Sequence, residues 1–247
     1  MRRYLPLYLA SVCLSAAMPA AAATYSVTPT RVVLTARTAS TLLTITNDSA
    51  ETLRLQVSVH AWQQSPAGEM QLTATEDVIA FPALFSLAAG ESRKVRVAQT
   101  AGAGALEKSY RIYVEELAQT ASVEQTAVRM LTRLGIPVFV QPERPRARAE
   151  LREVGIRGGR LAFTLANTGN VFFIPDAVQV RAFTASGAAV EDQAPPAWYV
   201  LAGGSRAFAI TYAPPACQRI RRVLVEVRVG EVLLKSPLEV PDGICES

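Results

Sequence analysis

The segment LRLQVSVHAW, residues 53–62, alternates apolar and polar side chains with a period of two. That period is typical of a half-buried β-strand, in which successive side chains point to opposite faces of a sheet. Similar alternation, or a run of β-branched residues, recurs in STLLTITND (40–48), SRKVRVAQ (92–99), SYRIYVEEL (109–117) and GIPVFVQP (135–142). No long stretch has the 3.6-residue period of an amphipathic helix, so we predict an all-β fold.

The strand pattern occurs twice along the chain. After Pro142 the segment ERPRARAE, residues 143–150, is rich in charge and proline and poor in core residues, which is typical of a linker. A second series of short strands follows it, with turns at Gly158-Gly159 and Gly203-Gly204. Strand-like segments at a spacing of roughly 8 to 12 residues predict β-sandwiches. We therefore expect two sandwich domains, at residues 24–142 and 143–247.

The first 23 residues have the order of a secretory signal peptide, with Arg2 and Arg3 followed by a short apolar run and a string of small residues. We expect cleavage near Ala23–Thr24, and no later segment predicts a membrane span in the mature protein. Removing Arg2 and Arg3 leaves 23 basic residues against 21 acidic ones, a balance that does not favour nucleic-acid binding.

Two cysteines, Cys217 and Cys245, remain once Cys13 leaves with the signal peptide. In an exported chain a pair of cysteines is expected to form one disulfide, which would join the penultimate strand region to the C-terminal tail. The alternative, two free thiols in a reducing compartment, conflicts with the signal peptide.

The residues that could support catalysis are few. His60 is the single histidine and lies within the strand pattern of residues 53–62, which argues against a histidine metal site or a Ser-His-Asp arrangement. Glu115 and Glu116 are adjacent on a predicted strand and would point to opposite faces, so they do not form an acid–base pair. We predict a binding protein with no catalytic residues, no metal and no cofactor.

The segment SVTPTRVVLTA, residues 26–36, predicts a first strand with Arg31 in its middle. An arginine on such a strand is ordinarily solvated and carries no function. The alternative is that Arg31 awaits a negatively charged ligand.

The order of these segments resembles the periplasmic pilus chaperones of the chaperone–usher pathway. VTPTRVVLT (27–35) is similar to that family's first strand with its arginine, and NDSAETLRLQVSVHAW (47–62) to its second. Five more segments resemble it in the same order: residues 77–97, YRIYVEEL (110–117), LTRLGIPVFVQP (131–142), and LANTGNVFF and WYVLAGGSRAF in the second half. The resemblance covers essentially the whole mature chain.

The resemblance implies two immunoglobulin-like β-sandwich domains joined in an L or boomerang shape. It also implies a periplasmic protein that binds, folds and caps pilin subunits and delivers them to an outer-membrane usher. A pilin lacks its last strand, and the chaperone lends one by donor-strand complementation, a form of β-augmentation. The other possibilities are a pilin or adhesin subunit, which would be one short domain, and a secreted enzyme on a sandwich scaffold.

The donor strand implied by the resemblance lies within residues 123–140. Its apolar positions Val128, Met130 and Leu134 would serve the subunit, whereas residues 136–140 would belong to the chaperone's own core. The alternative is that all of these positions are ordinary sandwich interior.

The family also implies a pair of basic residues that binds the C-terminal carboxylate of the subunit. Arg31 matches the first of them, but the position of the second falls at or near Pro137, which has no donor group. We expect Arg133 to substitute, with Arg129 as the alternative. This departure from the family pattern indicates a branch distant from the best-known adhesive-pilus chaperones.

Glu116 resembles the acidic residue that fixes the angle between the domains of these chaperones. Gln141 stands at the position of its usual basic partner, so Arg144 or another linker arginine would have to supply the missing positive charge. An exposed glutamate without that role is an equal alternative.

Overall fold

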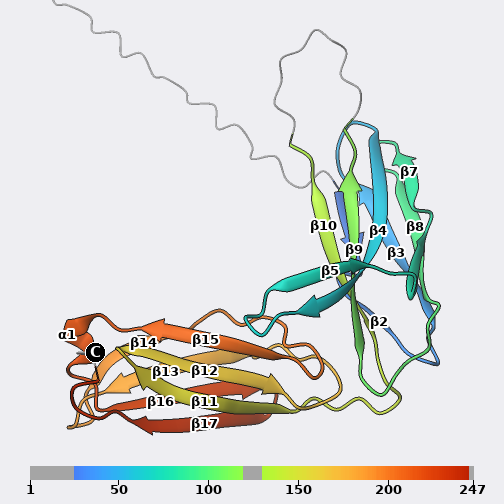
Figure 1. Cartoon of the computed structure of the whole chain (residues 1–247). Coiled ribbons are helices and arrows are strands. Elements are labelled where there is room, and N and C mark those ends of the chain that lie inside the picture. The colour runs from blue at the N-terminus through green and yellow to red at the C-terminus, as the bar shows by residue number, and fades with distance from the viewer. Residues whose placement is uncertain (1–24, 119–129, 245–247) are drawn as a thin grey trace, which may run out of the picture.

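The structure, a computed structural model, describes residues 25–118 and 130–244 and is built almost entirely of β-strands. Two β-sandwiches meet at an elbow (Figure 1), so the predicted all-β fold with two sandwich domains is confirmed. The helix α1 (Pro214–Cys217) is four residues long, and no helix within the described ranges is long and apolar enough to cross a membrane.

The N-terminal sandwich packs two sheets against each other. The first has the order β1 (Tyr25–Thr28), β3 (Ser40–Asn47), β8 (Ser92–Gln99) and β6 (Val78–Phe81). The second has the order β2 (Val32–Leu34), β10 (Arg133–Val140), β9 (Lys108–Glu116), β4 (Leu53–Gln64) and β5 (Met70–Ala74), with β7 (Leu84–Leu87) also paired to β4. The alternation predicted for residues 53–62 is observed, because Leu53, Leu55 and Val57 are buried between the sheets.

The C-terminal sandwich has a three-stranded and a four-stranded sheet. The first contains β11 (Ala149–Arg157), β12 (Arg160–Asn167) and β15 (Ser205–Thr211). The second contains β14 (Ala189–Gln193), β13 (Ala177–Phe183), β16 (Arg222–Val229) and β17 (Val232–Glu239). Cys217 is buried and disulfide-bonded. Cys245 lies outside the described residues, so the predicted pairing of the two stays a prediction.

The segment at residues 26–36 is two strands rather than the single strand expected. β1 pairs antiparallel with β3 in one sheet, whereas β2 pairs parallel with β10 in the other. The chain bends between them at residues 29–31, where Pro29 has no amide hydrogen to continue a ladder. Arg31 therefore lies in a crossing between sheets and is exposed, not in the middle of a strand.

Candidate functional site

An aromatic cluster lies at the corner of the elbow, where the outer face of the β4–β9–β10 sheet meets loops of the C-terminal domain. Phe139 of β10 stacks on Phe172 with ring centroids 3.9 Å apart, and Trp62 of β4 meets Tyr199 edge-on at 5.2 Å. Trp62 and Phe139 are almost completely buried, although both point away from the N-terminal core. The two domains therefore share a small apolar core of their own.

Hydrogen bonds of Gln64 and Glu107 cross the same joint. The Gln64 amide donates to the Tyr199 carbonyl at 2.9 Å and accepts from the Leu201 amide at 3.1 Å. A Glu107 carboxylate oxygen accepts from the Phe172 amide at 2.8 Å, and its backbone amide donates to the Asn170 carbonyl at 2.9 Å. Backbone groups of the C-terminal domain are thus held at four points, which fixes its orientation.

Glu107 is only 6% exposed, and its second carboxylate oxygen has no partner. Burial raises the pKa of this carboxyl from 4.5 to about 7, and hydrogen bonds from the Phe172 amide and the Gln141 side chain only partly oppose that effect. The joint therefore contains a carboxyl group whose charge changes near neutral pH.

Arg31 lies at the edge of this corner. Its guanidinium carbon is 5.5 Å from the centroid of the Phe172 ring, so the side chain reaches across from the N-terminal to the C-terminal domain. Among residues 25–118 and 130–244 no carboxylate forms an ion pair with it. The resemblance matches Arg31 to the first of the two basic residues that bind a subunit carboxylate, and that role stays a prediction.

Arg111 is the residue that the sequence interpretation missed. It is 7% exposed, and its guanidinium carbon is 4.2 Å from the centroid of the Trp62 ring. Nη1 donates to the Gly135 carbonyl at 3.3 Å, but Nε and Nη2 are buried with no hydrogen-bond partner. Burial lowers the pKa of the group. A buried cation without a counter-ion is costly, which is a common sign of a binding site.

Arg31 and Arg111 lie at the same register position, on opposite sides of β10. Arg31 directly precedes Val32, which pairs with Val138, and Pro137 is paired with Arg111 on the other side. Neighbouring strands are about 4.8 Å apart, so the two backbones lie roughly 10 Å from each other. In the sheet the two residues flank Pro137, at or near which the resemblance places the second basic residue.

Arg133 lies elsewhere and already has a partner. It forms an ion pair with Glu115, and its guanidinium carbon is 3.8 Å from the centroid of the Tyr113 ring. It precedes Pro137 by four residues, which is about 13 Å along an extended strand. The structure therefore does not place Arg133 beside Arg31. The alternative anchor, Arg129, lies outside the described residues.

Of the predicted donor positions, only Leu134 lies in β10 within the described residues. Val128 lies outside the described residues, and Met130 is 86% exposed just before the strand. Leu134 is partly buried against the N-terminal core, and Ile136, Val138 and Val140 are buried in it as expected.

Glu116 requires a correction. It is the last residue of β9, paired with Leu55, and its amide donates to the Thr132 carbonyl. β9 runs from the joint at Lys108 to its far end at Glu116 (Figure 1), so Glu116 does not lie between the domains. Glu107, just before the strand, has that place instead, and Gln141 is its neighbour. The resemblance identified the strand but not the end of it that meets the second domain.

His60 of β4 is paired with Arg111 of β9. Its ring and the Tyr113 ring form a T-shaped pair with centroids 5.8 Å apart. Within the described part of the chain no group of three or more His, Cys, Asp or Glu residues is placed to hold a metal ion.

Residues 24–146 match the family described as "Pili and flagellar-assembly chaperone, PapD N-terminal domain". The chain also resembles the CsuC–CsuE chaperone–tip adhesion subunit pre-assembly complex of Acinetobacter baumannii, with a TM-score of 0.57, 19% identity and coverage of 87% of this chain and 98% of that one. The chain resembles the Class 5 fimbriae chaperone CfaA with a TM-score of 0.57 and 15% identity, over 88% of this chain and 99% of that one. It resembles the complex of the Salmonella enterica SafA pilin with the SafB chaperone with a TM-score of 0.57 and 14% identity, over 87% of this chain and 96% of that one. At such low sequence identity, the structural similarity shows that these proteins share the fold of this chain.

Proposed function

Because the chain belongs to the family of pilus-assembly chaperones of the chaperone–usher pathway, we propose that it binds and caps pilin subunits in its interdomain cleft by donor-strand complementation. The family consists of chaperones rather than enzymes. Pilus chaperones of this family are periplasmic, in agreement with the predicted signal peptide. Delivery of the subunit to an outer-membrane usher completes the proposal.

The observation that carries this proposal is the pair of arginines in the cleft. Arg31 is open to solvent, and Arg111 lies deeper with Nε and Nη2 unpartnered. The planar fork of a guanidinium binds a carboxylate with two parallel hydrogen bonds. A C-terminal carboxylate would supply the counter-ion that Arg111 lacks among the described residues. We therefore assign Arg31 and Arg111 as the subunit anchor, in place of Arg31 and Arg133.

The edge of β10 supports the donor-strand step. β10 pairs with β9 along its whole length, Arg133–Val140, but with β2 only over Val138–Val140. Along Arg133–Pro137 the edge opposite β9 therefore has no strand partner among the described residues. An open edge is the template on which another chain adds a strand. A subunit strand laid there would lie beside Met130 and Leu134 and lead toward the anchor.

The test is co-expression with a candidate pilin and co-purification from the periplasm, using Arg31→Ala, Arg111→Ala and Arg133→Ala. Removing one partner of a buried charge-assisted contact costs about 2 to 5 kcal/mol. Arg31→Ala and Arg111→Ala should each weaken binding at least about 30-fold, whereas Arg133→Ala, which removes an ion pair internal to the chaperone, should change it little.

Two comparisons make the result specific. Tryptophan fluorescence of the unbound Arg111→Ala variant checks that Trp62 keeps its environment. A pilin whose C-terminal carboxylate is amidated should bind the wild-type chaperone as weakly as the unmodified pilin binds Arg31→Ala or Arg111→Ala. If Arg133→Ala loses binding and Arg111→Ala does not, the second anchor is at the start of β10, four residues before Pro137. If the wild type leaves the pilin no more soluble than without it, the chaperone function itself is refuted.

A further inference from the structure

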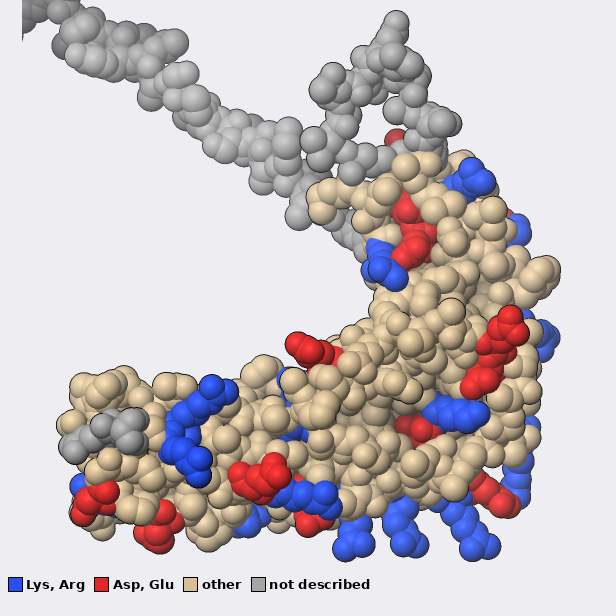
Figure 2. All heavy atoms as spheres, in the orientation of Figure 1, with Lys and Arg blue, Asp and Glu red and all other residues tan. Residues whose placement is uncertain are grey.

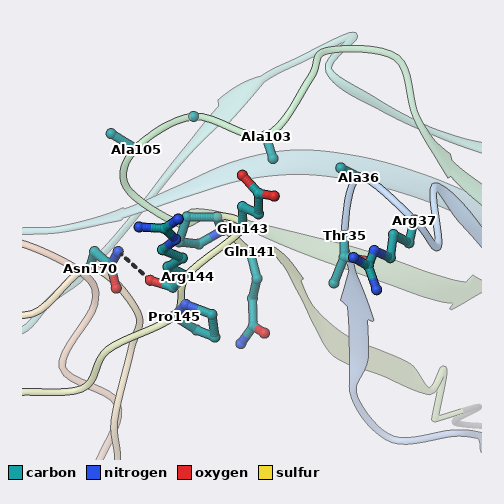
Figure 3. Close-up of a pocket in the computed structure, with 12 residues that line it drawn as sticks. Thr35, Ala36, Arg37, Ala103, Ala105, Gln141, Glu143, Arg144, Pro145 and Asn170 are labelled. Carbon is teal, nitrogen blue, oxygen red and sulfur yellow. Dashed lines mark hydrogen bonds between the residues drawn. The ribbon is translucent and has the colours of Figure 1, made fainter.

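The linker predicted at residues 143–150 is hydrogen-bonded to the turn at residues 168–170, and its last two residues, Ala149 and Glu150, begin β11. The Asn170 side chain donates to the Arg144 carbonyl at 2.9 Å (Figure 3). It also accepts from the Arg146 amide at 2.6 Å. The Asn170 amide donates to the Arg146 carbonyl and the Thr168 amide to the Arg148 carbonyl, at 2.9 and 2.8 Å. A Cβ added to Gly169 would lie 2.2 Å from the Arg146 carbonyl oxygen, so only glycine allows this approach.

This backbone presents its arginines in a fixed array. Extended chains place alternate side chains on one side, so Arg146 and Arg148 project together, about 6.6 Å apart along the chain. Arg144 precedes them at a bend, and all three are exposed. Figure 2 shows basic side chains projecting together from the lower edge of the molecule by the elbow. We call Arg37, Arg144, Arg146 and Arg148 the elbow array.

The acidic residues nearby leave this array largely unneutralised. Glu150 forms its ion pair with Arg152 at 2.8 Å, and Arg148 adds only a smaller effect on the same carboxylate. Glu143 lines the adjoining hollow. Within the described ranges none of the four arginines has a direct ion pair, so the array carries a strong local excess of positive charge.

A hollow of about 1020 Å³ adjoins the array at the joint. Arg37 and Arg144 lie on opposite sides of it, with alanine and proline side chains around it (Figure 3). Its lining includes neither Arg31 nor Arg111. A hollow of this kind accepts a length of polypeptide, whereas a flat membrane would touch only its rim.

We propose that the elbow array binds an acidic polypeptide segment in an extended conformation. Carboxylates on alternate residues of such a segment repeat at the spacing of Arg146 and Arg148. The segment continues into the hollow, where its next carboxylates meet Arg144 and Arg37 and its small apolar side chains meet the alanines. Because this surface uses neither Arg31 nor Arg111, the same molecule can hold a subunit and this partner at once.

The test uses the full mature chain and a fluorescein-labelled ten-residue peptide of alternating aspartate and serine, with binding measured by anisotropy. Arg146→Glu/Arg148→Glu should weaken binding at least tenfold. The matched control is Arg157→Glu/Arg160→Glu, which makes the same charge change on exposed arginines of a remote hairpin and should alter affinity less than twofold. Binding of the wild type should also fall steeply between 50 and 300 mM NaCl, values chosen because screening shortens the Debye length from about 14 to about 6 Å.

Vesicles of phosphatidylglycerol and phosphatidylethanolamine provide the second arm. Selective loss of peptide binding in the array variant, with weak vesicle binding by the wild type, supports the proposal. Equal losses in both variants would show that net charge alone is responsible and overturn it. Absence of peptide binding, or vesicle binding that depends on Arg146 and Arg148 where peptide binding does not, would also overturn it.

Discussion

Replacing Glu107 with glutamine should remove a pH dependence of stability that originates at the joint between the domains. The folded protein holds this proton more tightly than the unfolded chain, because burial raises the pKa of the carboxyl from 4.5 to about 7. The stabilisation from the bound proton is therefore complete below pH 4.5 and is lost as the pH rises through 7. A tenfold change in proton affinity corresponds to about 1.4 kcal/mol, so the whole effect amounts to roughly 3 kcal/mol.

Urea unfolding at pH 5 and pH 8 measures this effect, with tryptophan fluorescence as the signal because Trp62 lies in the joint. Between pH 5 and pH 8 the free energy of unfolding of the wild type should fall, relative to that of Glu107→Gln, by most of this roughly 3 kcal/mol. Glutamine keeps an oxygen for the Phe172 amide and has no charge to bury. The exposed Glu69→Gln is the control and should follow the wild type. Parallel pH profiles for wild type and Glu107→Gln would refute the reasoning.

Two further substitutions test how the domains are held. Gln64→Ala removes two hydrogen bonds across the joint and should lower the free energy of unfolding by about 1 to 3 kcal/mol, while the exposed neighbour variant Gln63→Ala should have no effect in the same urea titration. Gly169→Ala forces a methyl group against the linker backbone and should cost about 1 to 3 kcal/mol, seen as a drop of several degrees in Tm by calorimetry. Gly102→Ala, where a Cβ meets nothing within 4 Å, is its control, and an equal drop in both variants would contradict the close approach.

The strands could be predicted from the sequence because burial on one face imposes a period of two, as in residues 53–62. The crossing at residues 29–31 could not, since alternation shows which face a residue takes but not which sheet its strand joins. Pro29 was the available signal, because a residue without an amide hydrogen interrupts a ladder.

The candidate site shows the same limit. An arginine such as Arg111 on the outer face of a strand is ordinarily solvated, and only the packing of Trp62 and the C-terminal domain over that face makes it a buried cation. The position of Glu107 likewise depends on which end of β9 meets the second domain. Both properties arise from contacts between segments far apart in the chain, which no local pattern encodes.

The pairing of β2 with β10 also has a kinetic consequence. It joins Val32–Leu34 to Val138–Val140, so the loop between them spans almost the entire N-terminal domain. Closing so long a loop costs chain entropy before its contacts form, and folds rich in such distant pairs form slowly. Until Val140 is in place, β9 lacks its neighbour and exposes an unpaired edge. A polypeptide synthesised from its N-terminus would therefore pass through a stage in which this domain is itself an incomplete sandwich.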